Sequence, residues 1–265
     1  MKLSLLILFS TSLLAQSIAT DGYGLIDKPE PFTTEQSQSM FEQGKQMCSN
    51  NCVNDFGTVL GESQGVKAYS NCQSQCIHPE FSFLNLNTNE VTIHAENPKD
   101  DNLHYIGLVY QCVEYARRWW MINYGITFGS IDSAHEIIYL EEGKSIRTNE
   151  NFPLARSING TAKIAPKKGD LLVYYPDRNN PLWRHGHVAV VVDVDEQQGW
   201  IALAEENYNN KLWQNPESYS RKISLFKTNG YYQVLDIEPG MSENTSGGLI
   251  SGWIYPQTTG KTTKN

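Results

Sequence analysis

Five cysteines occur in the chain, and their spacing sets one of them apart. Four of them form two CxxxC pairs, Cys48 with Cys52 and Cys72 with Cys76, whereas Cys112 stands alone. Four thiols can close two disulfides, so the fifth is an intermolecular linker, an inert buried thiol or a reactive nucleophile. The choice depends on whether the rest of the sequence offers this thiol a base.

The pattern around Cys112 predicts that it lies at the start of a helix. Val113, Ala116 and Trp120 recur at helical spacing, and Gly125 ends the pattern. A thiol in the first turn lies close to unpaired amide groups and to the positive end of the helix dipole, which favours the thiolate. The alternative is a cysteine that only packs in the core, because free cysteines are among the most buried residues.

A histidine and a carboxylate follow on two neighbouring predicted strands. In the strand over residues 187–194 every even position is valine and faces the core, so His187 faces the other way. The returning strand covers residues 200–207 and contains Glu205. If the turn between them has an odd number of residues, His187 and Glu205 lie on the same face, whereas a two-residue turn would separate them.

Together these side chains could form an activated thiol, in which the histidine takes the thiol proton and the carboxylate orients the ring. Asn207 falls on the same strand face as Glu205 and could polarise the site or the substrate. His185 and Glu206 are weaker candidates, because one precedes the strand and the other points to the valine side. The remaining histidines are interpreted as ordinary surface or packing residues: His78, His94, His104 and His135.

The first 19 residues have the pattern of a signal peptide. A positive start precedes an apolar stretch from Leu3 to Leu14, and small residues precede a cleavage site after Ala19. The stretch is too short to span a bilayer, and the alternative is an uncleaved anchor. No other segment is long and apolar enough to cross a membrane. We therefore expect a secreted or extracytoplasmic protein in a compartment that permits disulfides.

Residues 20–95 are predicted to form a cysteine-rich helical hairpin and a linker. Thr33 and Gln36 fit a capping box at the start of the first helix. Glycines at 57, 61 and 65 break the pattern before a second helix. A short apolar piece at 91–93 could add a strand to the linker.

The order of the four paired cysteines selects one disulfide connectivity. Facing residues of an antiparallel hairpin have residue numbers with a constant sum, and two pairings meet that condition together: Cys48–Cys76 and Cys52–Cys72. Each bridge could stabilise the unit by about 2–4 kcal/mol. The alternative is a four-thiolate metal site, although zinc sites usually use shorter CxxC loops and no long helices.

Composition excludes some classes of partner. The net charge is −8, and the only basic runs are Arg117-Arg118 and Lys167-Lys168, so we expect no nucleic-acid partner. The acidic balance favours cationic or neutral substrates over polyanions. The sequence has no metal-binding or cofactor motif, so we expect no metal or cofactor, and we expect a monomer.

The segment around Cys112 resembles a known family. Residues 111–119 and 123–125 are similar to the amidase domain of glutathionylspermidine synthetase/amidase and trypanothione synthetase, which belongs to the CHAP group of cysteine amidohydrolases and peptidases. Residues 186–189 and 204–207 fit its second and third motifs, and 252–254 resemble its closing strand. D-alanyl-glycyl endopeptidase-like proteins are the secreted members that this chain resembles most.

The resemblance implies an α+β, papain-like/NlpC-P60 (CHAP) fold, with a catalytic helix packed on an antiparallel sheet. The disulfide-stapled helical hairpin predicted from the cysteine spacing would precede it. It implies Cys112 as nucleophile, His187 as base and Glu205 as orienting acid. The expected division of the chain is a signal peptide at 1–19, the hairpin and linker at 20–95, the CHAP domain at 96–256 and a flexible tail at 257–265.

The resemblance also implies auxiliary roles. Gln111 and Asn207 fall near the oxyanion site, and Arg117 matches a position near the substrate, although it could instead be a structural arginine. The chain departs from the bifunctional enzymes in its signal peptide, its disulfides and the lack of a synthetase half. We therefore expect hydrolysis of amides in peptidoglycan peptides. The alternatives are an amidase of glutathionylspermidine-like polyamine conjugates and a catalytically inactive wall-binding or glycan-binding protein.

Overall fold

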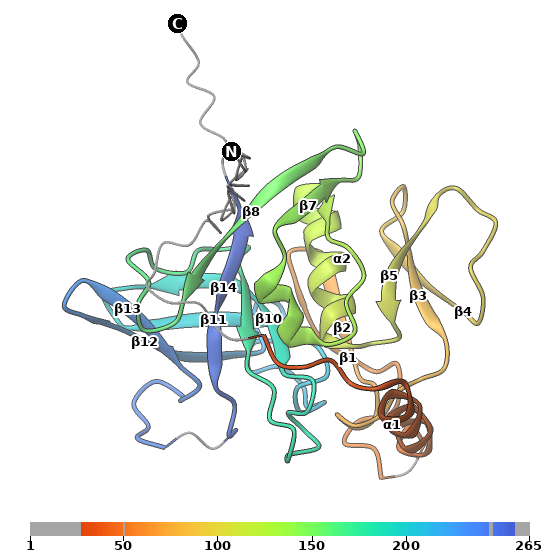
Figure 1. Ribbon diagram of the computed structural model, residues 1–265, viewed down its shortest axis with the longest axis horizontal. Coiled ribbons are helices and arrows are strands. Elements are labelled where there is room, and N and C mark those ends of the chain that lie inside the picture. The colour runs from red at the N-terminus through yellow and green to blue at the C-terminus, as the bar shows by residue number, and fades with distance from the viewer. Residues whose placement is uncertain (1–27, 50, 244–245, 258–265) are drawn as a thin grey trace, which may run out of the picture.

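The computed structural model describes residues 28–49, 51–243 and 246–257 (Figure 1). The predicted signal peptide at 1–19 and all but the first residue of the predicted tail at 257–265 lie outside the described residues. Within the described part no helix is long and apolar enough to cross a membrane.

Strands outnumber helices in the described part. The helices are α1 (Thr34–Gln46), α2 (Cys112–Tyr124) and the 3₁₀ helix η1 (Ala134–Tyr139). The strands are β1 (Val59–Ser63), β2 (Val66–Tyr69), β3 (Phe81–Asn85), β4 (Glu90–His94), β5 (Leu103–Leu108), β6 (Ile126–Thr127), β7 (Glu142–Ser145), β8 (Asn151–Ile158), β9 (Leu171–Tyr174), β10 (His187–Asp195), β11 (Trp200–Ala204), β12 (Arg221–Thr228), β13 (Tyr231–Leu235) and β14 (Ile250–Pro256).

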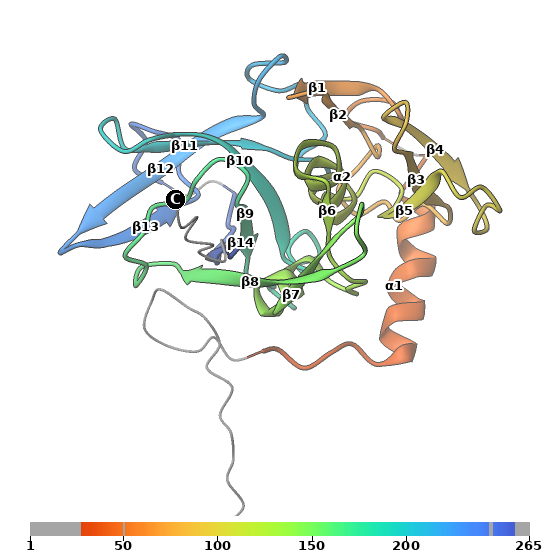
Figure 2. The ribbon, with the colours of Figure 1, turned by 90° about the horizontal axis from the view of Figure 1, so that it is seen from above.

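A nine-stranded antiparallel sheet organises the fold, with the strand order β13-β12-β11-β10-β9-β14-β8-β7-β6 (Figures 1 and 2). The helix α2 packs on β10 near the middle of this sheet. A second sheet has the order β4-β3-β5, and β1 and β2 form a separate hairpin. The predicted α+β class, with a helix packed on an antiparallel sheet, is therefore confirmed.

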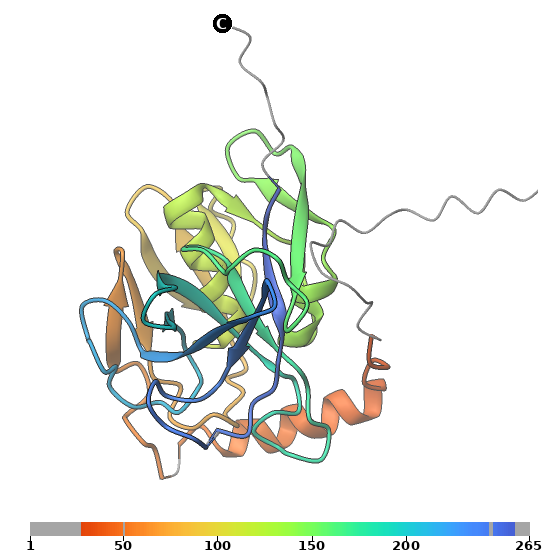
Figure 3. The ribbon, with the colours of Figure 1, turned by 90° about the vertical axis from the view of Figure 1, so that its left-hand side faces the viewer.

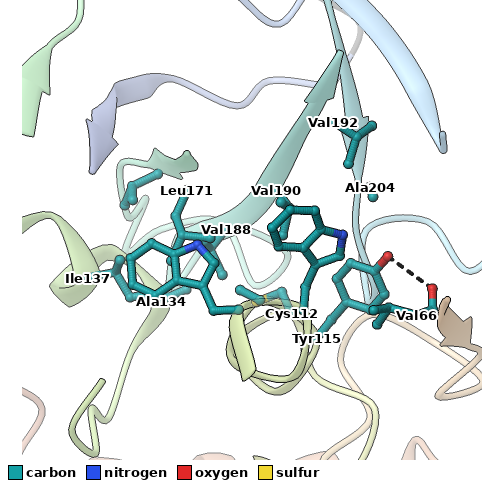
Figure 4. Close-up of a cluster of buried hydrophobic side chains, with 14 of the residues drawn as sticks. Val66, Cys112, Tyr115, Ala134, Ile137, Leu171, Val188, Val190, Val192 and Ala204 are labelled. Carbon is teal, nitrogen blue, oxygen red and sulfur yellow. Dashed lines mark hydrogen bonds between the residues drawn. The ribbon is translucent and has the colours of Figure 1, made fainter. Parts of the chain in front are cut away.

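The alternation in β10 builds a core on each side of the sheet. Val188, Val190 and Val192 face α2 and meet its buried side chains, as Figure 4 shows. The intervening residues Ala189 and Val191 belong to a second core on the opposite face. The predicted parity of the strand is correct. Both faces of β10 are covered, however, because an apolar core packs on each side of the sheet at this strand.

Toward His187, the pairing of β10 with β11 places odd residues opposite odd residues, as expected, but not because of an odd turn. Asp195 pairs with Trp200, so the connecting loop at 196–199 has an even number of residues. An even loop alone would place His187 and Glu205 on opposite faces. The pairing shifts between Val191 and Asp193, however, and this irregularity restores the odd-with-odd register.

The N-terminal region differs from the predicted helical hairpin. Its first helix is present as α1, and Thr33 and Gln36 form the expected capping box. The predicted second helix is wrong, because the β1–β2 hairpin and turns occupy residues 57–76. The apolar residues Val66 and Ala68 alternate with polar ones and join the core beneath α2, which favours strands over a helix here.

The predicted disulfides nevertheless form, as Cys48–Cys76 and Cys52–Cys72. The chain doubles back between the two cysteine pairs, as the argument assumed, but all four cysteines lie in turns or loops outside α1, β1 and β2, so the argument selected the right pairs from the wrong elements. The predicted linker is also more ordered than expected. Residues 91–93 lie in β4, as expected, and β3 and β5 complete a three-stranded sheet that leads the chain to α2.

Candidate active site

Cys112 is the first residue of α2 and is buried, with 8% of its surface exposed. The chain reaches it through a sharp turn in which Tyr110 has a φ of 52°. That unfavourable backbone conformation is held by packing, because the Tyr110 ring lies 4.9 Å from Tyr69 and 5.1 Å from Phe56. The turn places the sulfur at the N-terminal end of the helix, as predicted.

His187 is the first residue of β10 and is held within an aromatic enclosure. The preceding residue, Gly186, has a φ of 66°, and a Cβ atom on it would lie 2.5 Å from the carbonyl oxygen of Tyr174, so only glycine fits. The imidazole lies 5.5 Å from the Tyr174 ring, 6.2 Å from Trp183 and 5.8 Å from Tyr208. These contacts fix the orientation of the ring.

His187 links Cys112 to Glu205. Its Nε2 lies 2.8 Å from Oε2 of Glu205, so Nδ1 is the nitrogen left for the thiol. Burial by itself lowers the pKa of His187. Hydrogen bonds to Cys112 and Glu205, together with the negative charges of these two groups, outweigh burial and raise this pKa to about 9. The imidazolium form therefore persists at neutral pH.

Arg221 holds Glu205 ionised. Its Nε donates to Oε1 of Glu205 at 2.7 Å, and the Ser220 hydroxyl donates to the same oxygen at 2.9 Å. Burial raises the pKa of Glu205, but the Arg221 charge and the His187 hydrogen bond lower it to about 2. Arg221 also pairs with Asp236 and donates to the Tyr174 hydroxyl at 2.9 Å. The carboxylate is thus fixed from two sides.

Sequence reasoning missed Arg221, Ser220 and Asp236. Ser220 and Arg221 reach Glu205 because β12 pairs with β11, and Asp236 reaches Arg221 from the end of β13. No local pattern in the sequence predicts these pairings or their register. The three predicted residues of the triad, by contrast, are brought together in the structure.

The competing residues lie in separate environments. Glu206 accepts from the Tyr69 backbone at 2.6 Å and from Arg118 at 3.0 Å, and Arg118 also binds Glu114. Burial and the Glu114 charge raise the pKa of Glu206 well above its usual value. The prediction that Glu206 points to the valine side is consistent with this position beside α2.

His185 faces away from the triad. Its Nδ1 lies 2.8 Å from the Ser133 hydroxyl, and burial together with the nearby Arg178 and Arg184 charges lowers its pKa to about 4. It is therefore neutral at physiological pH, and its hydrogen bond goes to Ser133 rather than to Glu205 or Cys112. This leaves His187 as the base that the geometry supports.

Gln111 and Asn207 lie together beside the thiol. The Asn207 amide donates to Oε1 of Gln111 at 2.5 Å, and Gln111 in turn donates to the carbonyl oxygen of Cys76 at 2.8 Å. Asn207 follows the end of β11 with a φ of 53°, so it is not the strand residue that the sequence suggested. Each amide retains a second N–H that could donate to a ligand.

Arg117 is buried, and its guanidinium donates to three backbone carbonyls, those of Ile106, Phe128 and Gly129. Burial lowers its pKa to about 10. These contacts tie β5 and the loop after β6 to α2, which supports the structural interpretation. Its side chain also lines the cavity described next, so a role toward substrate remains a prediction.

A cavity of about 1100 Å³ opens beside Cys112 and His187. The face of α1 that carries Met40, Phe41 and Gly44 forms one wall. Gly44 packs so closely on Ile77 that a Cβ atom would lie 2.6 Å from that side chain. Figures 2 and 3 show the extended segment before α1 running along one side of the domain to reach it. The N-terminal region therefore shapes the site.

Residues 102–207 match the family model of the CHAP domain. This part of the chain is a CHAP domain. The match begins just before β5 and contains Cys112, His187, Glu205 and Asn207. The CHAP domain thus holds the whole of the predicted triad, whereas Arg221 lies beyond the matched residues.

Two relatives of known name are similar to this chain over most of its length. The chain is 31% identical over 202 residues to the trypanothione synthetase of Crithidia fasciculata, a match covering 75% of this chain and 26% of that protein. It is 29% identical over 182 residues to the bifunctional glutathionylspermidine synthetase/amidase of Escherichia coli (strain K12), covering 68% and 27%. The chain thus spans about a quarter of the length of these relatives. The CHAP domain and the amidase relative support a hydrolase that acts on amide bonds.

Replacing Glu205 with glutamine is expected to lower kcat/KM by about 10²- to 10⁴-fold. A carboxamide has one acceptor oxygen, whereas Glu205 accepts from His187 with one oxygen and from Arg221 and Ser220 with the other. The amide NH₂ must then face a donor, which disturbs the histidine tautomer. Glu206→Gln is the matched control and should change kcat/KM little, because its raised pKa makes the native side chain resemble a neutral amide. A larger loss for Glu206→Gln would contradict the assignment.

Breaking the two disulfides separately is expected to affect catalysis unequally. The loops they close have sequence separations of 28 and 20, so loop entropy predicts stability losses that differ by only about 0.3 kcal/mol. The Cys48→Ala/Cys76→Ala variant should lower kcat more than the Cys52→Ala/Cys72→Ala variant, because the Cys76 carbonyl anchors Gln111. Urea unfolding and steady-state kinetics measure both effects. Equal kcat values would show that this anchor has no role in turnover.

Proposed function

We propose that this protein is a cysteine amidohydrolase in which Cys112 is the nucleophile, His187 the general base and acid, and Glu205 the orienting carboxylate. The observation that carries the proposal is the continuous path of contacts from Cys112 through His187 to Glu205, anchored on Arg221. A buried histidine with a raised pKa beside a thiol at a helix start is the arrangement that thiol hydrolases require.

The chemistry follows from these positions. The Cys112 thiolate attacks the amide carbonyl carbon, and the imidazolium of His187 protonates the departing amine, which leaves a thioester. Neutral His187 then takes a proton from water as the water attacks the thioester, and the acid product and the thiol are released. The Cys112 backbone N–H at the start of α2 has no intrahelical acceptor, so with the Gln111 and Asn207 amides it can donate to the oxyanion.

For the substrate we propose an amide of peptidoglycan peptides. Two disulfides support an extracytoplasmic location, together with the signal-peptide pattern of the sequence, and bacterial wall peptides are amides found outside the cytoplasm. The amidase relative favours a second candidate, the amide of glutathionylspermidine or a similar conjugate.

Mass spectrometry separates these candidates. Purified peptidoglycan and glutathionylspermidine are incubated in parallel with the protein and with its Cys112→Ala variant. Peptide fragments that appear only with the unsubstituted protein support the first candidate, and glutathione with free spermidine supports the second. Absence of turnover on both, with Cys112 unreactive toward iodoacetamide, would instead support an inactive binding protein.

A further inference from the structure

The cavity beside Cys112 has a positive wall, although the chain as a whole has a net charge of −8. Arg117, Arg178 and Arg184 line it, and none of them has an ion-pair partner among the residues that the structure describes. The acidic residues lining it are Asp132 and Glu136, and Glu136 lies 3.7 Å from Lys28. The charge lining the cavity is therefore opposite in sign to the net charge of the chain. A bound substrate responds mainly to the charge that lines the cavity.

Arg178 is held in place without a direct ion pair in the described part of the chain, although the Glu136 charge acts on it from a distance. Its Nη2 donates to the Glu30 carbonyl oxygen at 2.9 Å, and its guanidinium lies 3.6 Å from the centre of the Phe32 ring. Its Nη1 is buried and has no hydrogen-bond partner within the described ranges. A cation that is partly desolvated and unpaired is costly, and a bound anion would offset that cost.

Arg184 lies in the same loop between β9 and β10, three positions before His187 in the sequence. Arg178 and Arg184 both line the cavity, and the charges of both lower the pKa of His185, which lines it too. Arg117 approaches from α2, on the helix that begins with Cys112. Arginines from two separate elements thus line the cavity.

We propose that this cavity selects amide substrates that carry a carboxylate, bound by Arg178 and Arg184 in the same cavity that Cys112 lines. The inference rests on the proposed function and names the substrate class of the same site. A guanidinium donates two parallel hydrogen bonds to a carboxylate, which gives both charge and orientation. It also corrects the expectation from composition that cationic or neutral substrates are favoured.

Alkylation of Cys112 tests the charge near the thiol without a known substrate. Iodoacetate carries a carboxylate, and iodoacetamide is its uncharged counterpart; in both reactions the thiolate sulfur forms a bond to the CH₂ carbon as the C–I bond breaks and iodide leaves. Cys112 is the free cysteine of the described chain, and the other four of the five are in disulfides, so the rates report on this thiol.

The ratio of the two rate constants, iodoacetate over iodoacetamide, is measured for three proteins. We expect the Arg178→Gln/Arg184→Gln variant to lower this ratio about tenfold relative to the unsubstituted protein, which corresponds to about 1.4 kcal/mol. Arg147→Gln, at an exposed position outside the cavity lining, is the matched control and should leave the ratio unchanged. His187 attracts iodoacetate in all three proteins, so the difference isolates the two arginines.

An unchanged ratio in the double variant, with Cys112 still reactive, overturns the carboxylate site but leaves the proposed function intact.

If neither reagent alkylates Cys112, the proposed function fails, and calorimetry then tests the carboxylate site. Hippurate should bind the unsubstituted protein about tenfold more tightly than hippuramide, and the double variant should lose that difference. Equal binding of the two compounds by the unsubstituted protein also overturns the site.

Discussion

Replacing Cys112 with alanine is expected to lower kcat/KM on any amide substrate by at least about 10⁵-fold. The proposed reaction passes through a thioester, and alanine has no atom that can form it. The fold should persist, because alanine is a good helix former and the thiol occupies a buried position that a methyl group nearly fills. Initial rates and thermal unfolding of the two proteins measure these effects.

Cys112→Ser is the control for this experiment. It keeps a nucleophilic atom of similar size but replaces the thiolate with a hydroxyl, so residual turnover should lie between that of the native protein and the alanine variant. Trapping the acyl-enzyme by mass spectrometry should succeed only with a nucleophile at position 112. Turnover by Cys112→Ala within tenfold of the native rate would contradict covalent catalysis.

Replacing His187 with alanine is expected to have a comparable effect, about 10⁴-fold or more in kcat/KM. The imidazole acts twice, since it accepts the thiol proton and then protonates the leaving amine. Its removal also leaves the Glu205 carboxylate without a hydrogen-bond donor on Oε2, apart from the more distant Arg221 Nη2 at 3.4 Å. Stability should be measured alongside activity, because the histidine is enclosed by aromatic rings.

The pH dependence of kcat/KM offers an independent check on His187. Its raised pKa means that the folded protein binds the proton more tightly than a free histidine does, so the imidazolium persists below about pH 9 and is lost above it. Activity should therefore decline on the alkaline side with an apparent pKa near 9, which belongs to the coupled thiol and imidazole together. A decline centred near 6.5 would show that the ion pair does not form.

Local patterns in the sequence were enough to predict where the candidate catalytic residues lie in the fold. The helical spacing around Cys112 placed the thiol in a first turn, and the alternation after Gly186 placed His187 at the start of a strand. These inferences succeed because helix and strand periodicities act over a few residues. The cysteine pairing also followed from spacing, although the bridges join turns and loops rather than the two predicted helices.

The sequence-based prediction was wrong where one sequence pattern is compatible with two different structures. Residues 57–76 contain glycines between short apolar pieces, which fit an interrupted helix as well as the β1–β2 hairpin. The hairpin forms because it lets Val66 and Ala68 pack in the core beneath α2. That contact involves residues outside the segment, so the segment's own sequence does not reveal it. Likewise, the sequence favoured an odd turn before β11, whereas the structure has an even loop followed by a register shift between Val191 and Asp193.

By itself the sequence predicted the three residues of the candidate triad and the cysteine pairing, because both predictions depend on spacing along the chain. Only the tertiary structure decided how they are held and what surrounds them. Arg221 reaches Glu205 through the pairing of β11 with β12, and Arg178 is fixed by Glu30 and Phe32, far away in sequence. Such contacts depend on how the whole sheet and α1 pack, and packing energy is set by the complete core rather than by any one segment.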